Sequence, residues 1–367
     1  MWTFHLPTKI IFGSGSAATL SATLGKRAVL VIGPVVGKLP AIKAIVEKLS
    51  PVAVFDDVRP NPTVANVDAL TAFLKKEKAE EIVAIGGGSV LDCAKAAAFL
   101  AATEDASIRD YHSGGKPVDR QGLRLITVPT TSGTGSEVTP IAVLDDEEKS
   151  IKAPLVSPWF FPSCAIVDPD LTLSVPLGVT AATAFDSLSH CIEGYWSKHN
   201  QPICSALAKE AAQAIFDNLP KVYDNLADPV AREKLSYAAL VAGIAFQMPK
   251  NAIMHACSYP LSNRAHLPHG AACALTMEAS IRLNAPHMGG RMEEFAAACG
   301  FATVEGMIAQ ITVLKKRGGL PCTLNEANIP PEMVETLIQE SFHPVMKNNP
   351  KEVTMEDLQK IYREIAG

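Results

Sequence analysis

Four side chains of types that bind transition metals lie in the second half of the chain: Asp186, His190, His255 and His269. Asp186 and His190 stand four residues apart in a stretch that we expect to be helical, so both side chains share one helix face. One carboxylate oxygen and three imidazole nitrogens suit Fe²⁺, Zn²⁺ or another divalent transition ion, and the donor types do not choose among them. An ion held by four protein ligands, with one coordination position open, would bind a substrate oxygen and act as a Lewis acid.

Each of these residues has a simpler structural explanation when it is taken alone. An aspartate and a histidine one turn apart are usually a solvated pair on a helix surface. His255 lies in the apolar stretch 252–257, where a hydrogen-bonded core histidine is the default, and His269 fits an ordinary loop. The prediction of a metal centre therefore depends on the tertiary structure bringing all four residues together.

Two loops in the first half of the chain have the composition of phosphate-binding loops. Gly86, Gly87, Gly88 and Ser89 stand between the apolar run 81–85 and a predicted helix, where backbone amides and a helix N-terminus favour a phosphate. The loop 129–137, Pro-Thr-Thr-Ser-Gly-Thr-Gly-Ser-Glu, follows the apolar run 124–128. At the carboxyl ends of strands in one sheet, both loops would bind a dinucleotide or diphosphate. The first loop does not match G-x-G-x-x-G, and for each loop an ordinary turn is the alternative.

The order of predicted elements indicates two domains. In the first half of the chain, strands alternate with helices, which predicts a parallel, doubly wound sheet. The expected strands are 8–12 (an edge strand or a hairpin), 28–32, 51–55, 81–85 and 124–128. The expected helices are at 39–49, after Asn61-Pro62-Thr63, and in the segment that ends at Ala101. Helical segments follow at 179–196, 201–217, 229–247, 270–284, 303–316 and 331–341, and a last helix has Thr354 and Asp357 placed for a capping box. We predict an α/β dinucleotide-binding domain at 1–177 and an all-helical metal-binding domain at 178–367.

The composition narrows the function classes. The net charge of −5 and the lack of a basic block disfavour nucleic acid and anionic membranes as partners. No apolar run approaches the roughly 20 residues that span a bilayer, and the N-terminus has no signal-peptide core, so we expect a cytoplasmic protein. The eight scattered cysteines lack a Cys-x-x-Cys motif, which argues against zinc ribbons and thioredoxin-type chemistry and favours buried, reduced thiols.

An ordered series of motifs over nearly the whole chain resembles the iron-containing (group III) alcohol dehydrogenases. The series comprises Phe12-Gly13, Asn61-Pro62-Thr63, Gly-Gly-Gly-Ser-Val-Leu-Asp at 86–92 with Lys95, the loop 129–137, Asp168-Pro169, Phe185-Asp186 with His190, His255, Pro268-His269-Gly270 and Asn348-Asn349-Pro350. The resemblance implies a dehydroquinate synthase-like architecture, with a Rossmann-like first domain and a helical second domain. It also implies a reaction in which a hydride passes between the substrate carbon and the nicotinamide.

The resemblance assigns roles to the matching positions. The metal ligands would be Asp186, His190, His255 and His269. The residues that contact the cofactor would be Gly86, Gly87, Gly88, Ser89, Asp92, Thr130, Thr131, Thr134 and Lys152.

Three positions depart from the common family pattern. Tyr259 replaces a histidine that relays a proton in many members; with a reference pKa of about 10 it is a poorer base, and we expect it to shape the pocket or donate a hydrogen bond. Gly33 replaces an aspartate that favours NAD, so NADP(H) is expected beside NAD(H). The segments 249–251 and 258–264 resemble relatives that reduce phosphonoacetaldehyde or sulfoacetaldehyde; Lys250 and Arg264 would pair with the anion, or are solvated surface cations.

These observations predict a metal-dependent, NAD(P)-linked alcohol dehydrogenase or aldehyde reductase that acts on a small, anionic or neutral substrate. We expect Fe²⁺, with Zn²⁺ as the alternative ion. The competing hypotheses are a dehydroquinate-synthase-like lyase, a glycerol-dehydrogenase-like enzyme and a non-catalytic nucleotide-binding protein. The predicted partner is a second copy of the chain, paired through the strand at 8–12.

Overall fold

The chain forms two compact units in the computed structural model, which describes residues 1–25, 27–149 and 151–367. The first unit consists of His5–Thr131 and Gly135–Leu173. The second consists of Ser174–Gly367 together with Met1–Phe4 and Ser132–Thr134, so the helical unit also takes in two short segments from the first half of the chain.

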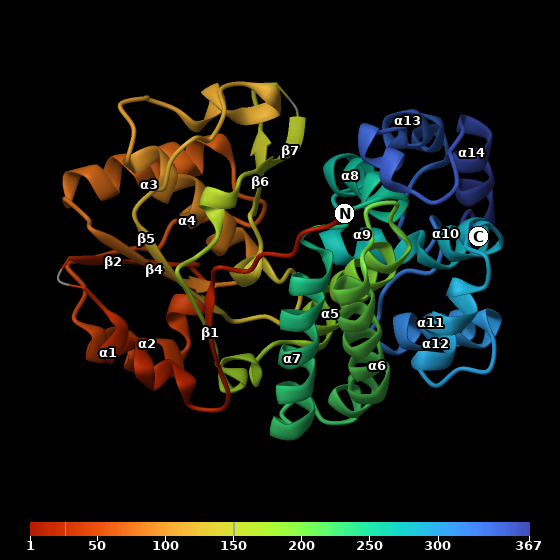
Figure 1. Ribbon diagram of the computed structural model, residues 1–367, viewed down its shortest axis with the longest axis horizontal. Coiled ribbons are helices and arrows are strands. Elements are labelled where there is room, and N and C mark those ends of the chain that lie inside the picture. The colour runs from red at the N-terminus through yellow and green to blue at the C-terminus, as the bar shows by residue number, and fades with distance from the viewer. Residues whose placement is uncertain (26, 150) are drawn as a thin grey trace. The chain divides into compact units, whose positions relative to one another are not determined.

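The first unit is built on a six-stranded parallel sheet in the order β1-β8-β5-β4-β2-β3 (Figure 1). Its strands are β1 (Lys9–Phe12), β2 (Ala28–Ile32), β3 (Ala53–Phe55), β4 (Glu81–Gly86), β5 (Arg124–Pro129) and β8 (Cys164–Val167). Gly86 at the end of β4 pairs with Pro129 at the end of β5. Because neighbouring parallel strands end at the same edge of a sheet, the two predicted phosphate-binding loops begin side by side.

Helices cover both faces of this sheet, α1 (Leu20–Thr23) and α2 (Pro40–Leu49) on one side and α3 (Val64–Lys76) and α4 (Gly88–Ala101) on the other (Figure 1). Successive side chains of a strand point to opposite faces. In β2, Val29 and Val31 accordingly join the core under α3 and α4, whereas Leu30 and Ile32 join the core under α2. This is why a continuous apolar run marks a buried strand.

Several elements of the first unit differ from the sequence predictions. The strand β1 lies at the sheet edge and pairs in parallel with β8, so the hairpin alternative for 8–12 is wrong. An antiparallel hairpin of β6 (Ile141–Asp146) and β7 (Ile151–Val156) forms a separate sheet, and neither it nor β8 was predicted. The helix after Asn61-Pro62-Thr63 is confirmed, with the Thr63 hydroxyl accepting from the Asn66 amide at its N-terminus.

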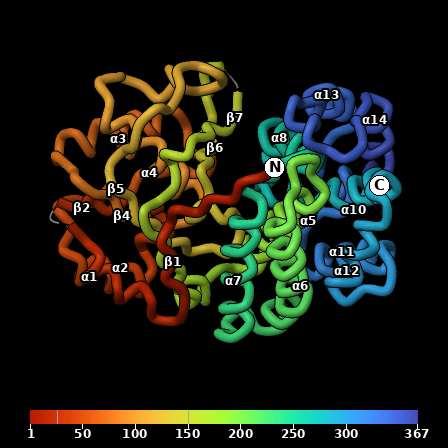
Figure 2. The backbone as a smooth tube through the Cα atoms, viewed as in Figure 1, coloured from red at the N-terminus to blue at the C-terminus, as the bar shows by residue number. Residues whose placement is uncertain are grey.

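The second unit is helical throughout (Figure 2). Its helices are α5 (Leu177–Trp196), α6 (Pro202–Asp224), α7 (Pro229–Phe246), α8 (Ile253–Ala265), α9 (His269–Leu275), α10 (Met277–Asn284), α11 (Arg291–Ala298), α12 (Val304–Arg317), α13 (Pro331–Ser341) and α14 (Met355–Glu364). The predicted helix at 270–284 is two helices, and α8 and α11 were missed. The capping box of Thr354 and Asp357 is confirmed.

The central helix of the second unit is α5, in which every residue from 184 to 196 is buried. A helix that is buried on all sides lies inside a core.

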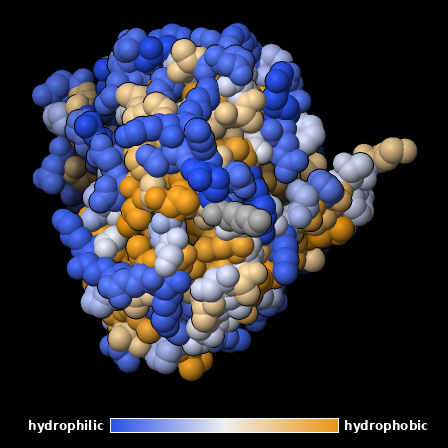
Figure 3. All heavy atoms as spheres, turned by 90° about the vertical axis from the view of Figure 1, so that its left-hand side faces the viewer, coloured by the Kyte–Doolittle hydropathy of each residue, from blue (hydrophilic) through white to orange (hydrophobic). Residues whose placement is uncertain are grey.

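The surface is mixed: on the face shown in Figure 3, hydrophobic side chains gather between hydrophilic regions. No helix in the described part of the chain combines the length and hydrophobicity that crossing a bilayer requires.

Candidate metal centre and nucleotide-binding loops

Three helices bring the four predicted metal ligands together. Helix α5 carries Asp186 and His190, α8 carries His255, and α9 begins at His269. The Nε2 atoms of the three histidines lie 3.8, 4.0 and 3.6 Å, in that order, from Oδ1 of Asp186. Donor atoms around one zinc-sized ion stand about 3–3.5 Å apart, given metal–donor distances of about 2 Å. The imidazoles therefore surround one carboxylate oxygen at nearly the spacing of a metal site.

Two buried nitrogens of this cluster have no hydrogen-bond partner among the described residues: Nδ1 of His190 and Nε2 of His255. A buried polar atom without a partner costs about 1–3 kcal/mol. The His255 side chain is 1% exposed, so water does not relieve this cost. A divalent transition ion would satisfy Nε2 of His255, which faces Asp186, and the donor types present fit such an ion.

Glu193, to which the sequence analysis assigned no role, orients His255. Oε2 of Glu193 accepts from Nδ1 of His255 at 2.7 Å and from the Ala252 amide at 2.8 Å, and Oε1 accepts from the Met254 amide at 2.6 Å. With its proton on Nδ1, His255 turns the lone pair of Nε2 into the cluster. Glu193 stands three residues after His190 on the same helix face, and that spacing was the signal that the sequence offered.

The two buried histidines of this cluster, His190 and His255, lie in environments of different charge. Burial, followed by the neighbouring His255 and His269, holds the pKa of His190 well below its usual range, so this imidazole is neutral. Its ring stacks on Phe246, with centroids 4.1 Å apart. Burial also lowers the pKa of His255, but the charge and hydrogen bond of Glu193 outweigh it and leave that pKa raised. Metal ligation uses the neutral form of both rings.

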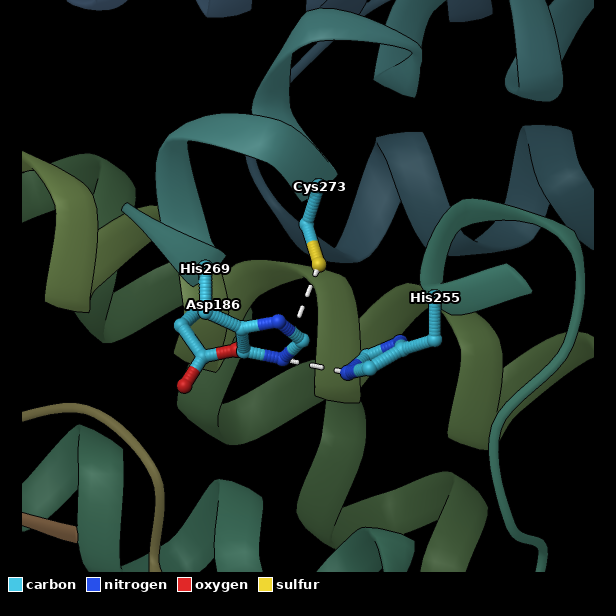
Figure 4. Close-up of side chains that lie close together, drawn as sticks. All are labelled: Asp186, His255, His269 and Cys273. Carbon is cyan, nitrogen blue, oxygen red and sulfur yellow. Dashed lines mark hydrogen bonds and ion pairs between the residues drawn. The ribbon is translucent and has the colours of Figure 1, made fainter. Parts of the chain in front are cut away.

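Cys273 joins the cluster although the sequence analysis gave it no role. Within the described residues, the group whose donor atoms all lie within 4.8 Å of one another comprises Asp186, His255, His269 and Cys273 (Figure 4). His190 lies outside this compact group. Cys273 follows His269 by four residues on α9, a helical spacing that would have linked the two in the sequence.

Gly270 allows α9 to approach α5. A Cβ atom at this position would lie 1.8 Å from the carbonyl oxygen of Ala182 and 3.1 Å from Cβ of Asp186. Only glycine permits such a contact between backbones. The close approach sets His269 beside Asp186.

Tyr259 lies on α8, one turn after His255, and its ring contacts His343 edge-on with centroids 5.2 Å apart. Burial raises the pKa of its phenol, and a hydrogen bond with the Asn251 side chain opposes the shift only in part. Arg264, on the same helix, is exposed and donates hydrogen bonds from Nε and Nη2 to the carboxylate of Glu340 on α13. Its guanidinium is thus already paired.

The β4–α4 loop has the construction of a phosphate site. Gly86 packs so closely that a Cβ there would lie 2.5 Å from Cγ2 of Val90, and Gly87 caps α4 without any side-chain hydrogen bond. The first amides of a helix carry partial positive charge and lack partners within the helix. Thr130, in the neighbouring loop, has a buried hydroxyl oxygen with no hydrogen-bond partner in the described ranges. These features fit a bound diphosphate.

Other predicted cofactor residues already hold the protein together. The Ser89 hydroxyl accepts from the Asn61 amide at 3.1 Å, and Lys152 donates to the Asn61 side chain at 2.9 Å. Thr131 packs against Gly87, where an added Cβ would meet its hydroxyl oxygen at 3.3 Å. Thr134 belongs to the helical unit.

Asp92 is fully engaged within the first unit. Its carboxylate accepts from the Ser136 hydroxyl at 2.5 Å and from the Val143 amide at 3.0 Å. Burial raises its pKa, against the opposing charge of Lys95. These bonds join α4 to the segment that follows β5.

Comparisons with known proteins agree with this construction. Residues 7–169 match the family model for iron-containing alcohol dehydrogenase, and residues 180–366 match the model for the C-terminal part of the Fe-containing alcohol dehydrogenase family. The chain is 31% identical to the 1-propanol dehydrogenase of Salmonella typhimurium over 100% of both chains. It is 30% identical to the NAD-dependent methanol dehydrogenase of Bacillus methanolicus over 99% of each.

Solved structures are similar over the whole chain. The crystal structure of sulfoacetaldehyde reductase from Bifidobacterium kashiwanohense in complex with NAD⁺ is 41% identical, with a TM-score of 0.95 over 100% of this chain and 99% of that one. A 1,3-propanediol oxidoreductase is 30% identical with a TM-score of 0.93 over 100% of both chains. The chain therefore belongs to the iron-containing alcohol dehydrogenase family.

Proposed function

We propose that this protein is a metal-dependent, NAD(P)-linked enzyme that interconverts a small primary alcohol and its aldehyde. The observation that carries the proposal is the convergence of three imidazoles on Asp186, with Nε2 of His255 buried and lacking a hydrogen-bond partner among the described residues. The proposed ion is Fe²⁺, with Zn²⁺ as its competitor, since both accept this oxygen and nitrogen donor set.

The side chains divide the work of the reaction. A bound divalent ion supplies Lewis-acid polarisation of the substrate oxygen, and a bound nicotinamide supplies or accepts the hydride. Asp186, His190, His255 and His269 hold the ion, and Glu193 fixes the tautomer of His255. The raised pKa of Tyr259 keeps its phenol protonated at neutral pH, so Tyr259 acts as a hydrogen-bond donor rather than a base.

The nucleotide is proposed to bind at the adjoining ends of β4 and β5. The amides of Gly87, Gly88 and Ser89 and the hydroxyl of Thr130 contact it, with Asp92, Thr131, Thr134 and Lys152 shaping or lining the site. Gly33 has no carboxylate to repel a 2′-phosphate, and a Cβ there would meet Cγ2 of Val90 at 3.3 Å. We therefore propose that NADPH is accepted as well as NADH.

The proposed substrate is a short aldehyde with an anionic group. The likeness to a sulfoacetaldehyde reductase supports this choice. The proposed pairing of the anion with Arg264 gains no support, because Glu340 already binds that guanidinium. We therefore expect the Arg264→Ala variant to keep its KM for anionic aldehydes.

A metal-reconstituted screen tests the proposal. The protein is loaded with Fe²⁺ or Zn²⁺ and assayed for oxidation of NADH and NADPH with propanal, sulfoacetaldehyde and phosphonoacetaldehyde. His255→Ala is the inactive control, and His287→Ala, at an exposed site outside the cluster, is the matched active control. Net nicotinamide turnover that depends on metal and on His255 is expected. The lack of net turnover with every aldehyde and both nicotinamides in the metal-loaded protein would refute the proposal and leave the lyase alternative, which regenerates its NAD.

We further propose that the protein self-associates and acts in the cytoplasm. Among the described strands, β1 is an edge strand of the six-stranded sheet, and an edge strand readily pairs with a second chain. Sedimentation of the wild type beside the Ile10→Pro variant tests the proposed self-association, and a monomeric wild type would refute it.

A further inference from the structure

Cys273 presents a thiol to the proposed metal centre. Its side chain is buried in α9, and Sγ lies 4.0 Å from Nε2 of His269. In Figure 4 the thiol points toward the imidazole of His269, beside Asp186 and His255. Two other buried thiols lie on the helices that carry metal ligands, Cys191 on α5 and Cys257 on α8. Neither belongs to the compact donor group found within the described residues.

A second feature of the same cluster indicates a ligand. Nε2 of His255 is buried, faces Asp186 at 4.0 Å and has no hydrogen-bond partner in the part of the chain that the structure describes. Glu193 holds the other nitrogen of this ring, so the lone pair on Nε2 cannot turn away. The thiol and this nitrogen therefore face one common space.

Two overlapping donor sets result. Asp186, His255 and His269 belong to both sets; His190 completes one with a nitrogen, and Cys273 completes the other with a sulfur. For zinc bonds of about 2.3 Å to sulfur and about 2.0 Å to nitrogen, tetrahedral ligands lie about 3.5 Å apart. The observed 4.0 Å between Sγ and Nε2 of His269 needs only a small closure.

We propose that Cys273 is a metal ligand that shifts the preference of this centre from Fe²⁺ toward Zn²⁺ and Co²⁺. The proposal deepens the proposed function, since it concerns the same metal centre. Thiolate is a soft ligand that favours zinc, whereas the oxygen and nitrogen set with His190 serves iron as well. As the sulfur–metal bond forms, the thiol S–H bond breaks and its proton passes to solvent.

The test uses cobalt as the probe. Full-length protein loaded with Co²⁺ is expected to show the near-ultraviolet charge-transfer band of a thiolate–cobalt bond. Cys273→Ala and Cys273→Ser are expected to lose the band, whereas Cys257→Ala, which removes an equally buried thiol two residues from His255, keeps it. Competition between Zn²⁺ and Fe²⁺ is expected to move toward iron by about tenfold or more in the Cys273 variants.

Two results would overturn the inference: a cobalt-loaded wild type without the band, or a band that persists in a Cys273 variant. The first of these results needs no variant, so the inference can be refuted even when a Cys273 variant fails to fold. Aldehyde reduction without the band sinks the Cys273 ligand alone, and the band without reductase activity sinks the proposed function alone.

Discussion

Glu193→Gln is expected to weaken metal binding without touching a metal ligand. The two oxygens of Glu193 accept from three donors, and its side chain is completely buried. Glutamine offers one acceptor oxygen, so its amide N–H must face a donor. In one orientation it faces the Met254 amide; in the other it faces Nδ1 of His255 and drives the imidazole proton onto Nε2, where the lone pair is needed.

The magnitude follows from these contacts. One buried donor left without an acceptor costs about 1–3 kcal/mol, and the other two bonds lose their charge. We expect the metal-free variant to lose about 2–4 kcal/mol of unfolding free energy. Loss of a carboxylate partner of a ligating histidine typically weakens metal affinity 10–100-fold, about 1.4–2.7 kcal/mol.

Chelator competition with Zn²⁺ and Co²⁺ at fixed pH gives the affinity, and urea unfolding of the metal-free protein gives the stability. Glu278→Gln is the matched control: Glu278 binds the buried Lys315 at 2.9 Å in the same unit, so that variant should lose stability and keep its metal affinity. The reasoning is refuted if folded Glu193→Gln binds metal within about threefold of the wild type, well short of the expected loss.

Three further predictions concern single residues. Gly270→Ala should weaken metal binding and destabilise the protein by at least about 1–3 kcal/mol, because the added Cβ would lie 1.8 Å from the Ala182 carbonyl oxygen. Chelator competition measures the metal affinity, and an affinity equal to that of the wild type would contradict the prediction. Tyr259→Phe should leave the shape of the pH–rate profile unchanged, because burial keeps the phenol of Tyr259 protonated; a lost basic limb in steady-state assays would show that the hydroxyl titrates in catalysis. Lys95→Met should cost about 2–4 kcal/mol in urea unfolding, since the Thr139 and Ile141 carbonyls lose their donor. Burial lowers the pKa of Lys95 from 10.5 to about 8, so the unfolded chain binds this proton more tightly than the folded chain. The unfolding free energy of the wild type should therefore rise as the pH increases from about 8 to 10.5. The Lys95→Met variant should lack this rise.

Local patterns in the sequence predicted the parts of this protein that depend on neighbours along the chain. The apolar runs of β2 and β4 indicated strands buried on both faces, and the three glycines after β4 indicated a loop entering a helix. Asp186 and His190 share a helix face because 3.6 residues complete a turn. These features need no knowledge of distant residues.

Elements whose form depends on packing escaped prediction. Helix α8, which carries His255, contains Pro260 and shows little amphipathic periodicity because most of it is buried. Strand β8 enters the sheet between β1 and β5, a placement set by pairing with strands far away along the chain.

The sequence by itself determined which donors were available, and their types followed from residue identity and helical spacing. Only the tertiary structure decided which of them meet. Glu193 reaches His255 across 62 residues, and α9 sets Cys273 beside the imidazoles because Gly270 lets two helix backbones touch. Contacts between distant segments arise from packing of whole helices, and no local period in the sequence encodes that packing.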